Sequence, residues 1–212
     1  MPDELTKYRL SIQRVALVFS TLGNPLLTSA FLLSAACFRF VNSARAMQVL
    51  SALVVLLLLP IALWNLGRVR SGHYSDFDVS RREDRRTLYP LIVGLPLLAA
   101  GTLFLTGQPR SLWFGMLCAS IMTSIAASVN RWIKISLHAA FAFFCAVAVA
   151  RLSMAWVAPA VVFAVLVACS RFILKRHTVS ELVLGTGLGL GAGTALVLAL
   201  RIMDQHDLAN LR

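Results

Sequence analysis

The sequence predicts an all-α fold: a polytopic membrane bundle of six or seven transmembrane helices, in a single domain over residues 1–212. Of its 212 residues, 58% are hydrophobic, and the mean hydropathy is +0.78. Only 14% are charged, whereas a soluble globular domain carries roughly 25%. The apolar residues also gather in runs close to the length of a bilayer-spanning helix, roughly 17–25 residues.

The apolar runs define the predicted helices in chain order. We expect them at about 15–38, 46–66, 88–106, 112–129, 135–150, 154–169 and 182–200. Asn24-Pro25 lies inside the first run, where proline predicts a kink. This run lacks a small-residue cleavage site, so it predicts an uncleaved first span rather than a signal peptide. The fifth and sixth runs are short, which leaves the count at six or seven.

The last run contains Gly185, Gly189 and Gly193 at four-residue spacing. A glycine-rich stretch can cradle phosphate, but that motif follows a strand, and this stretch lies within an apolar segment. Small residues at this spacing are typical of helices that pack closely in a membrane. We therefore expect these glycines to face another helix.

The charge and cysteine patterns restrict the possible partners. The net charge of +11 comes from basic residues in short loops between apolar runs, which favours membrane lipids or anionic substrates and argues against nucleic acid. The four cysteines fall in or beside apolar runs without metal-type spacing. We expect no disulfide, no metal and no cofactor, and the sequence indicates no oligomeric state.

Three polar clusters interrupt the apolar runs, at residues 75–86, 134–138 and 170–181. Two predicted spans separate the first cluster from the second, and two more separate the second from the third. An even number of crossings returns the chain to the same side of a membrane. The three clusters are therefore predicted to meet at one membrane surface, with the functional core at about residues 67–200.

The third cluster carries the most chemistry. Arg171 can grip a phosphate with two parallel hydrogen bonds, and His177 can act as nucleophile, acid or base near neutral pH. Glu181 follows His177 by four residues, so on a helix its carboxylate can orient the imidazole. Alternatively, Thr178 and Glu181 form a capping box, and residues 175–177 are an interfacial basic loop.

The other two clusters each allow two interpretations. His138 lies at the edge of an apolar run, where a retained polar group is often functional. Alternatively it is an interface residue, with Ser136 capping the helix. The first cluster contains four arginines with intervening acids, which fits either an anion-binding site or a solvated loop held to anionic lipid.

The motifs resemble those of the type 2 phosphatidic acid phosphatase superfamily, which includes lipid phosphate phosphatases and vanadium haloperoxidases. Its third motif is Ser-Arg, five residues, His, three residues, Asp. Ser170, Arg171 and His177 match it, with Glu181 in place of Asp. Its second motif, Pro-Ser-Gly-His, is similar to residues 135–138, where the serine and histidine match.

The first family motif, Lys, six residues, Arg-Pro, has no counterpart here. Aligning Arg85 with the family arginine puts Asp78 at the lysine position, so we expect Arg82 and Arg85 to supply the cations differently. The resemblance covers about residues 78–181. The family core is usually counted as six spans.

The resemblance implies metal-independent hydrolysis of a lipid phosphate through a phosphohistidine intermediate. His177 would attack phosphorus, Glu181 would orient it, and His138 would protonate the leaving oxygen and then activate water. Glu181 is one methylene longer than the usual Asp. The residues expected to hold the phosphate oxygens are Arg171, Arg82, Arg85, Lys134, Ser136 and Ser170.

The substrate expected from this resemblance is an amphiphile: an isoprenoid monophosphate or diphosphate, a polyprenyl-linked sugar phosphate or a phosphatidate-like lipid. The alternatives are a non-catalytic anionic-lipid binding protein or transporter, and a lipid phosphotransferase. Fourteen of the 20 lysines and arginines lie on the predicted catalytic side. The positive-inside rule then favours a cytoplasmic site in a bacterial-type inner or plasma membrane.

Overall fold

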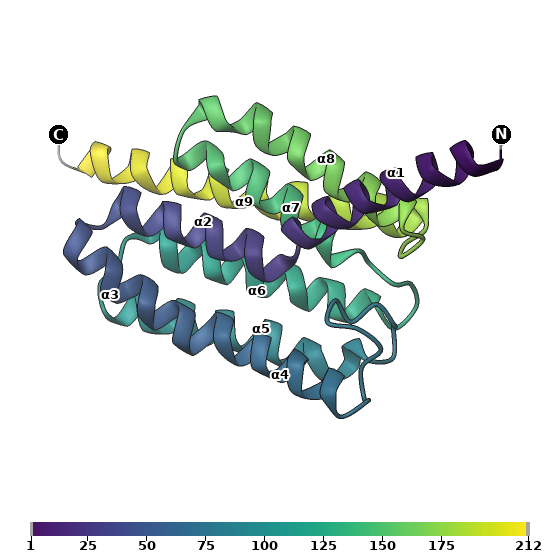
Figure 1. Ribbon diagram of the computed structural model, residues 1–212. Helices are drawn as coiled ribbons and strands as arrows, with labels where there is room; N and C mark the ends of the chain where they lie inside the picture. The colour runs from purple at the N-terminus through teal and green to yellow at the C-terminus, as the bar shows by residue number, and fades with distance from the viewer. Residues whose placement is uncertain (1, 211–212) are drawn as a thin grey trace.

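The computed structural model describes residues 2–210, and these residues form an all-α bundle without a strand (Figure 1). Among these described residues, five helical segments are long and apolar enough to cross a membrane: Ser43–Arg70, Arg85–Leu105, Arg110–Val129, Met154–Ile173 and Val179–Asp207. The bent pair Leu10–Leu22 and Pro25–Phe40 provides a sixth if it is one span. The prediction of an all-α polytopic membrane bundle is confirmed.

The elements follow one another with short connections, except for the loop at residues 71–84. In chain order they are α1 (Pro2–Leu22), α2 (Pro25–Phe40), α3 (Ser43–Leu53), the π-helix η1 (Val54–Leu58), α4 (Leu59–Arg70), α5 (Arg85–Leu105), α6 (Arg110–Val129), α7 (Leu137–Ala148), the 3-10 turns η2 (Val149–Arg151) and η3 (Met154–Trp156), α8 (Val157–Ile173) and α9 (Val179–Asn210).

The predicted kink at Asn24-Pro25 is confirmed. The two helices on either side are bent by 51°, because proline cannot donate the next helical hydrogen bond. The Asn24 side chain accepts a hydrogen bond from the Leu26 amide at 2.9 Å and so begins α2. This break brings the polar Asn24 side chain into the bundle, where it is buried.

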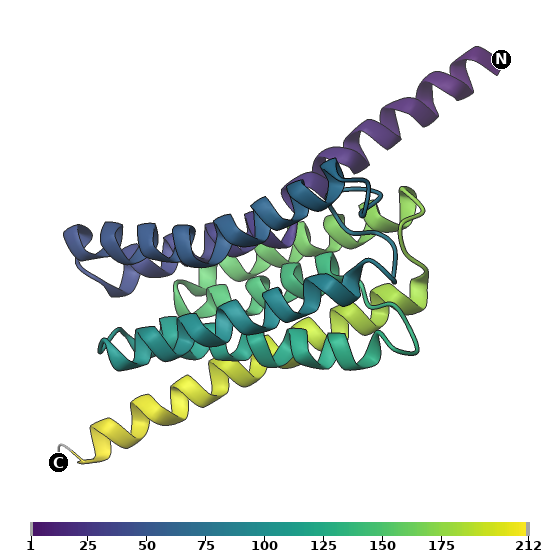
Figure 2. The ribbon, with the colours of Figure 1, turned by 90° about the horizontal axis from the view of Figure 1, so that it is seen from below.

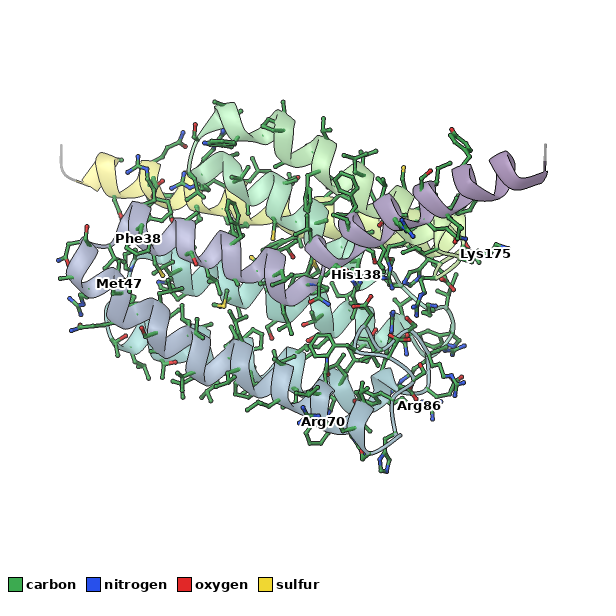
Figure 3. The ribbon with its side chains drawn as sticks, in the orientation of Figure 1. Phe38, Met47, Arg70, Arg86, His138 and Lys175 are labelled. Atoms are coloured by element: carbon green, nitrogen blue, oxygen red, sulfur yellow. The ribbon has the colours of Figure 1, made fainter. Side chains whose placement is uncertain are left out.

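Helix α7 is the buried centre of the bundle and is shorter than the predicted fifth span. Nine of its twelve residues are buried, and together with η2 the apolar segment ends at Arg151. Its neighbours are α9, α8 and α2, which surround it in Figures 1 and 2. The first turn of α7, which contains His138, lies toward the polar end of the bundle (Figure 3).

The predicted close packing of the α9 glycines is confirmed. A Cβ atom on Gly185 would lie 2.5 Å from the Ser136 carbonyl oxygen, and one on Gly189 would overlap the Ala140 carbonyl oxygen. Gly193 likewise lies against the turn of α7 that contains Val147. The alternating glycines at 187 and 191 face open space. Backbone contact between α7 and α9 therefore fixes the position of the first turn of α9.

The three polar clusters lie at one end of the bundle, as the span count predicts. Figure 3 shows Arg70, Arg86 and Lys175 at this end, with His138 nearer the centre of the bundle, and Phe38 and Met47 at the opposite end. At that opposite end, ion pairs of 2.6 and 2.7 Å hold α9 to α6 and η2, through Asp207 with Arg110 and Asp204 with Arg151.

Candidate active site

The loop at residues 71–84 folds inward and carries an acidic side chain into the bundle. Val79 is buried and has a φ of +51°, which is sterically unfavourable for a β-branched residue. Arg85 Nε donates to the Val79 carbonyl oxygen at 3.0 Å, and Asn65 Nδ2 donates to the Phe77 carbonyl oxygen at 3.3 Å. These two contacts hold the backbone on both sides of Asp78.

The Asp78 carboxylate connects three elements. Its Oδ2 atom accepts a 2.7 Å hydrogen bond from Arg171 Nη1 and lies 3.5 Å from His138 Nε2. Its Oδ1 atom accepts a 3.0 Å hydrogen bond from Asn24 Nδ2. Burial raises the pKa of Asp78, but the nearby His138 ring and the charge and hydrogen bond of Arg171 outweigh burial and hold this pKa well below its usual range. Asp78 is therefore ionised.

Arg171 is buried, with 1% of its side chain exposed. Its Nη1 atom donates to Ser20 Oγ at 2.6 Å as well as to Asp78. Within residues 2–210, its Nε and Nη2 atoms have no hydrogen-bond partner. Buried donors without a partner are energetically costly. This free edge of the guanidinium has the planar geometry that binds two oxygens of a phosphate.

His177 and Glu181 lie on one face, as their spacing predicts. His177 Nδ1 is 2.7 Å from Glu181 Oε2. The same Oε2 atom accepts from the Thr178 amide at 3.3 Å, and the Glu181 amide donates to Thr178 Oγ1 at 3.4 Å. The capping box and the histidine–carboxylate pair, given above as alternatives, are therefore both present. In the described part of the chain, the buried His177 Nε2 atom has no partner.

His177 is neutral in the folded protein. Burial, followed by the positive charges of Arg85, Lys134 and Arg171, lowers the pKa of His177 well below its usual range, despite the carboxylate beside Nδ1. With Nδ1–H donating to Glu181, the lone pair is on Nε2. This arrangement provides an unprotonated nitrogen in a strongly positive environment.

We expect His177 to stay in the neutral Nδ1–H form at about pH 5.5, where free histidine, with a pKa of about 6.5, is mostly protonated. Its lowered pKa means that the proton binds only at more acidic pH. Nitrogen-15 NMR of histidine-labelled protein in detergent checks this, with His177→Ala assigning the resonance. An imidazole at position 177 that is fully protonated at about pH 5.5 would contradict it.

Lys134 approaches the same site from the loop before α7. Its Nζ atom donates to the Arg176 carbonyl oxygen at 2.8 Å and lies 3.8 Å from Glu181 Oε2. Burial lowers the pKa of Lys134, Glu181 opposes this shift, and nearby arginines add to it. The Ser136 amide also donates to the Glu181 carbonyl oxygen at 3.2 Å, so the second and third clusters are directly joined.

The other predicted phosphate ligands contact the backbone. Arg85 is buried and donates to the carbonyl oxygens of Val79 and Ile135, and Arg82 donates to that of Asn130. These contacts hold the first cluster to the second. Ser136 accepts from the Ala139 amide and so caps α7, while Ser170 donates to the Val167 carbonyl oxygen. These four side chains support the loops and helix ends around Arg171 and His177.

Three residues at the site were not predicted as functional. Asp78 departs from the family motif at the lysine position and was not predicted to belong to the phosphate site. Asn24 is evident from the sequence only as part of a kink. Ser20 lies within an apolar run and has no motif around it. Asp78 could have been noticed because it lies seven residues before Arg85, which is the spacing between the lysine and the arginine of the first family motif.

An apolar cavity reaches Asp78 and His138 from the bundle interior. It has a volume of about 80 Å³ and lies between α2, η1, α4, α5, α6 and α7. A second interior cavity of about 60 Å³ shares wall residues with it and extends to Leu200 on α9. The side chains common to both walls are Ser29, Leu33, Met116, Ala119 and Phe141. The site therefore has a charged side and an apolar side.

The site combines the free Nε2 atom of His177, the Glu181 carboxylate that contacts the other ring nitrogen, the free Nε–Nη2 edge of Arg171, and His138.

No protein-family model matches this chain, and no curated protein or solved structure is significantly similar to it. The resemblance of its motifs to a phosphatase superfamily therefore stays a prediction. Any functional assignment depends on the chemistry of the site itself.

Proposed function

We propose that this membrane protein is a lipid phosphate phosphatase that works through a phosphohistidine intermediate, as in the type 2 phosphatidic acid phosphatase superfamily. The observation that carries the proposal is the pair of free groups at the site. His177 Nε2 is buried, unprotonated and without a partner in the described residues, and the Nε–Nη2 edge of Arg171 is also free. A nucleophile and an anion clamp are the two parts that phosphoryl transfer requires.

The first step transfers the phosphoryl group to the protein. The His177 Nε2 lone pair forms a bond to phosphorus, the bond from phosphorus to the leaving oxygen breaks, and His138 gives that oxygen a proton. Glu181 stabilises the positive charge that develops on the His177 ring through its 2.7 Å contact with Nδ1. Arg171 and Lys134 stabilise the negative charge on the non-bridging oxygens.

The second step releases phosphate. Water attacks phosphorus, His138 takes the proton of that water, and the bond between phosphorus and His177 Nε2 breaks. One water is consumed, and an alcohol and inorganic phosphate are formed. For a diphosphate substrate, the first product is a monophosphate instead of an alcohol. Dividing the reaction into two displacements replaces one difficult step with two easier ones.

An amphiphilic substrate is supported by the apolar cavity beside His138. A leaving oxygen protonated by His138 would lie beside this cavity, because His138 is part of its wall together with Leu57, Ile61 and Met116. A hydrocarbon chain attached to that oxygen would be shielded from water there. Isoprenoid phosphates and glycerolipid phosphates both have this chemistry.

A cytoplasmic position of the site, in a bacterial-type inner or plasma membrane, is supported by the distribution of charge. The basic residues concentrate around the loop at 71–84, the turn at 130–136 and the turn at 174–178. Short loops rich in lysine and arginine face the cytoplasm in most membrane proteins.

The decisive experiment compares wild type with His177→Ala in detergent. Phosphate release from a prenyl phosphate and a phosphatidate is measured in the presence of a chelator. We expect wild type to release phosphate and His177→Ala to lose it by about 1,000-fold or more, the scale of removing a catalytic nucleophile. His206→Ala is the matched control, because His206 is exposed on the last turns of α9, at the opposite end of the bundle.

Unchanged turnover in His177→Ala would contradict the phosphohistidine mechanism, and strict dependence on added magnesium would also count against it. Lipid binding that survives His177→Ala, without phosphate release from any lipid, would support the non-catalytic alternative. Transfer of phosphate to an added lipid alcohol would indicate a phosphotransferase.

A further inference from the structure

We infer that Asp78 is a positioning residue that fixes both the phosphate-binding arginine and the proton-donating histidine. This inference rests on the proposed function and adds a residue that the superfamily motif does not contain, since that motif has a lysine at this position. A carboxylate in a phosphate site is unexpected, because it repels the substrate. The contacts of Asp78 resolve this conflict.

The first contact orients Arg171. The two Nη1 protons of its guanidinium go to Asp78 Oδ2 at 2.7 Å and Ser20 Oγ at 2.6 Å. Because the guanidinium is planar, fixing Nη1 fixes the direction of the Nε–Nη2 edge. A phosphate that binds this edge lies away from the Asp78 carboxylate. Asp78 also compensates the buried positive charge of Arg171, which would be costly without a counterion.

The second contact acts on His138. Its Nε2 atom is 3.5 Å from Asp78 Oδ2 and makes no hydrogen bond within residues 2–210. This distance is too long to lock the Nε2 proton to the carboxylate, so a leaving oxygen can approach Nε2 beside Asp78. His138 must carry a proton at one stage of the cycle, and burial disfavours the charged ring. The carboxylate offsets that cost by charge.

The surrounding backbone holds Asp78 in this position. Val79 adopts its unfavourable φ of +51°, and Arg85 and Asn65 bind the carbonyl oxygens of the residues on either side of Asp78. Asn24, at the break between α1 and α2, donates to Oδ1. A loop that is sterically strained and held on both sides is typical of a functional constraint.

The test is Asp78→Asn, which keeps the size of the side chain and removes its charge. Two substrates are compared. Decyl phosphate has an alkoxide leaving group that needs a proton, whereas 4-nitrophenyl phosphate has a leaving group that departs without one. We expect kcat/KM, which reports the first displacement, to fall at least tenfold more for decyl phosphate than for 4-nitrophenyl phosphate, and KM to rise for both as Arg171 loses its orientation.

The matched control is Asp76→Asn, since Asp76 lies in the same loop but pairs at 2.9 Å with Arg176, which is partly exposed. We expect both substrates to be affected less than twofold there. An equal loss on both substrates in Asp78→Asn, or no loss, would overturn the inference. If Asp78→Asn does not fold, Asp78→Glu displaces the carboxylate by one methylene, and an unchanged ratio between the two substrates overturns the inference equally.

The same assay distinguishes failure of the proposed function from failure of the proposed role of Asp78. Wild type that hydrolyses neither substrate contradicts both the function and this inference. Wild type that is active and loses activity in His177→Ala, but keeps its substrate ratio in Asp78→Asn, contradicts the role of Asp78 alone.

Discussion

Replacing Arg171 by lysine is expected to lower the rate of phosphate release by about 100-fold or more while the protein still folds. Lysine keeps the positive charge that compensates Asp78, but it has no planar edge with two donors. The Nε and Nη2 atoms, which are free in the described residues, are therefore lost. Removing one preorganised donor from a transition-state site costs about 10²–10³ in rate. Steady-state kinetics on a prenyl phosphate checks this.

Arg176→Lys is the matched control for this variant. Arg176 lies in the following turn, and its side chain is 41% exposed and pairs with Asp76. We expect it to change the rate less than twofold. Arg171→Lys within threefold of wild type would show that charge alone holds the phosphate and would remove the role of the guanidinium edge.

Substituting alanine for Gly189 is expected to destabilise the bundle, whereas the same change at Gly187 leaves it unchanged or stabilises it. The new Cβ at position 189 would overlap the carbonyl oxygen of Ala140, and a backbone atom cannot move aside without shifting α7 or α9. Overpacking of this kind costs about 1–3 kcal/mol. At position 187 the Cβ meets open space, and alanine favours the helix by up to about 1 kcal/mol.

Thermal unfolding of the two variants in the same detergent measures this difference. The two glycines lie two residues apart on one helix, so helix propensity and detergent effects are matched. Equal melting temperatures for the two variants would contradict the backbone contact between α7 and α9.

The fold class and the meeting of the polar clusters followed from the sequence, because a bilayer restricts the chain to long apolar helices. Once the spans are counted, an even number of crossings between two loops places both loops on the same side of the membrane. The pairing of His177 with Glu181 was also predictable, since helical spacing is local. Similarly, the α9 glycines could be assigned to packing because their four-residue spacing defines one helix face.

The remaining contacts depend on three-dimensional geometry that sequence spacing does not contain. The role of Asp78 depends on the positive φ of Val79 and on Asn24, which comes from a distant helix break. Arg82 was predicted to hold phosphate, yet it donates to a backbone carbonyl oxygen in the turn before α7. Such carbonyl groups are present at every residue, so no motif indicates which arginine they will bind.

The length of the Glu181 side chain, one methylene more than the aspartate of the motif that this segment resembles, has a structural consequence. In a capping box, the side chain at the third helical position reaches back to the backbone amide of the N-cap residue, which glutamate is long enough to do. Glu181 makes this contact with the Thr178 amide. Here a single carboxylate caps the first turn of α9 and contacts the His177 ring. Unwinding of the first turn of α9 would therefore release the imidazole, so the proposed catalytic activity and the integrity of this turn would be lost or retained together.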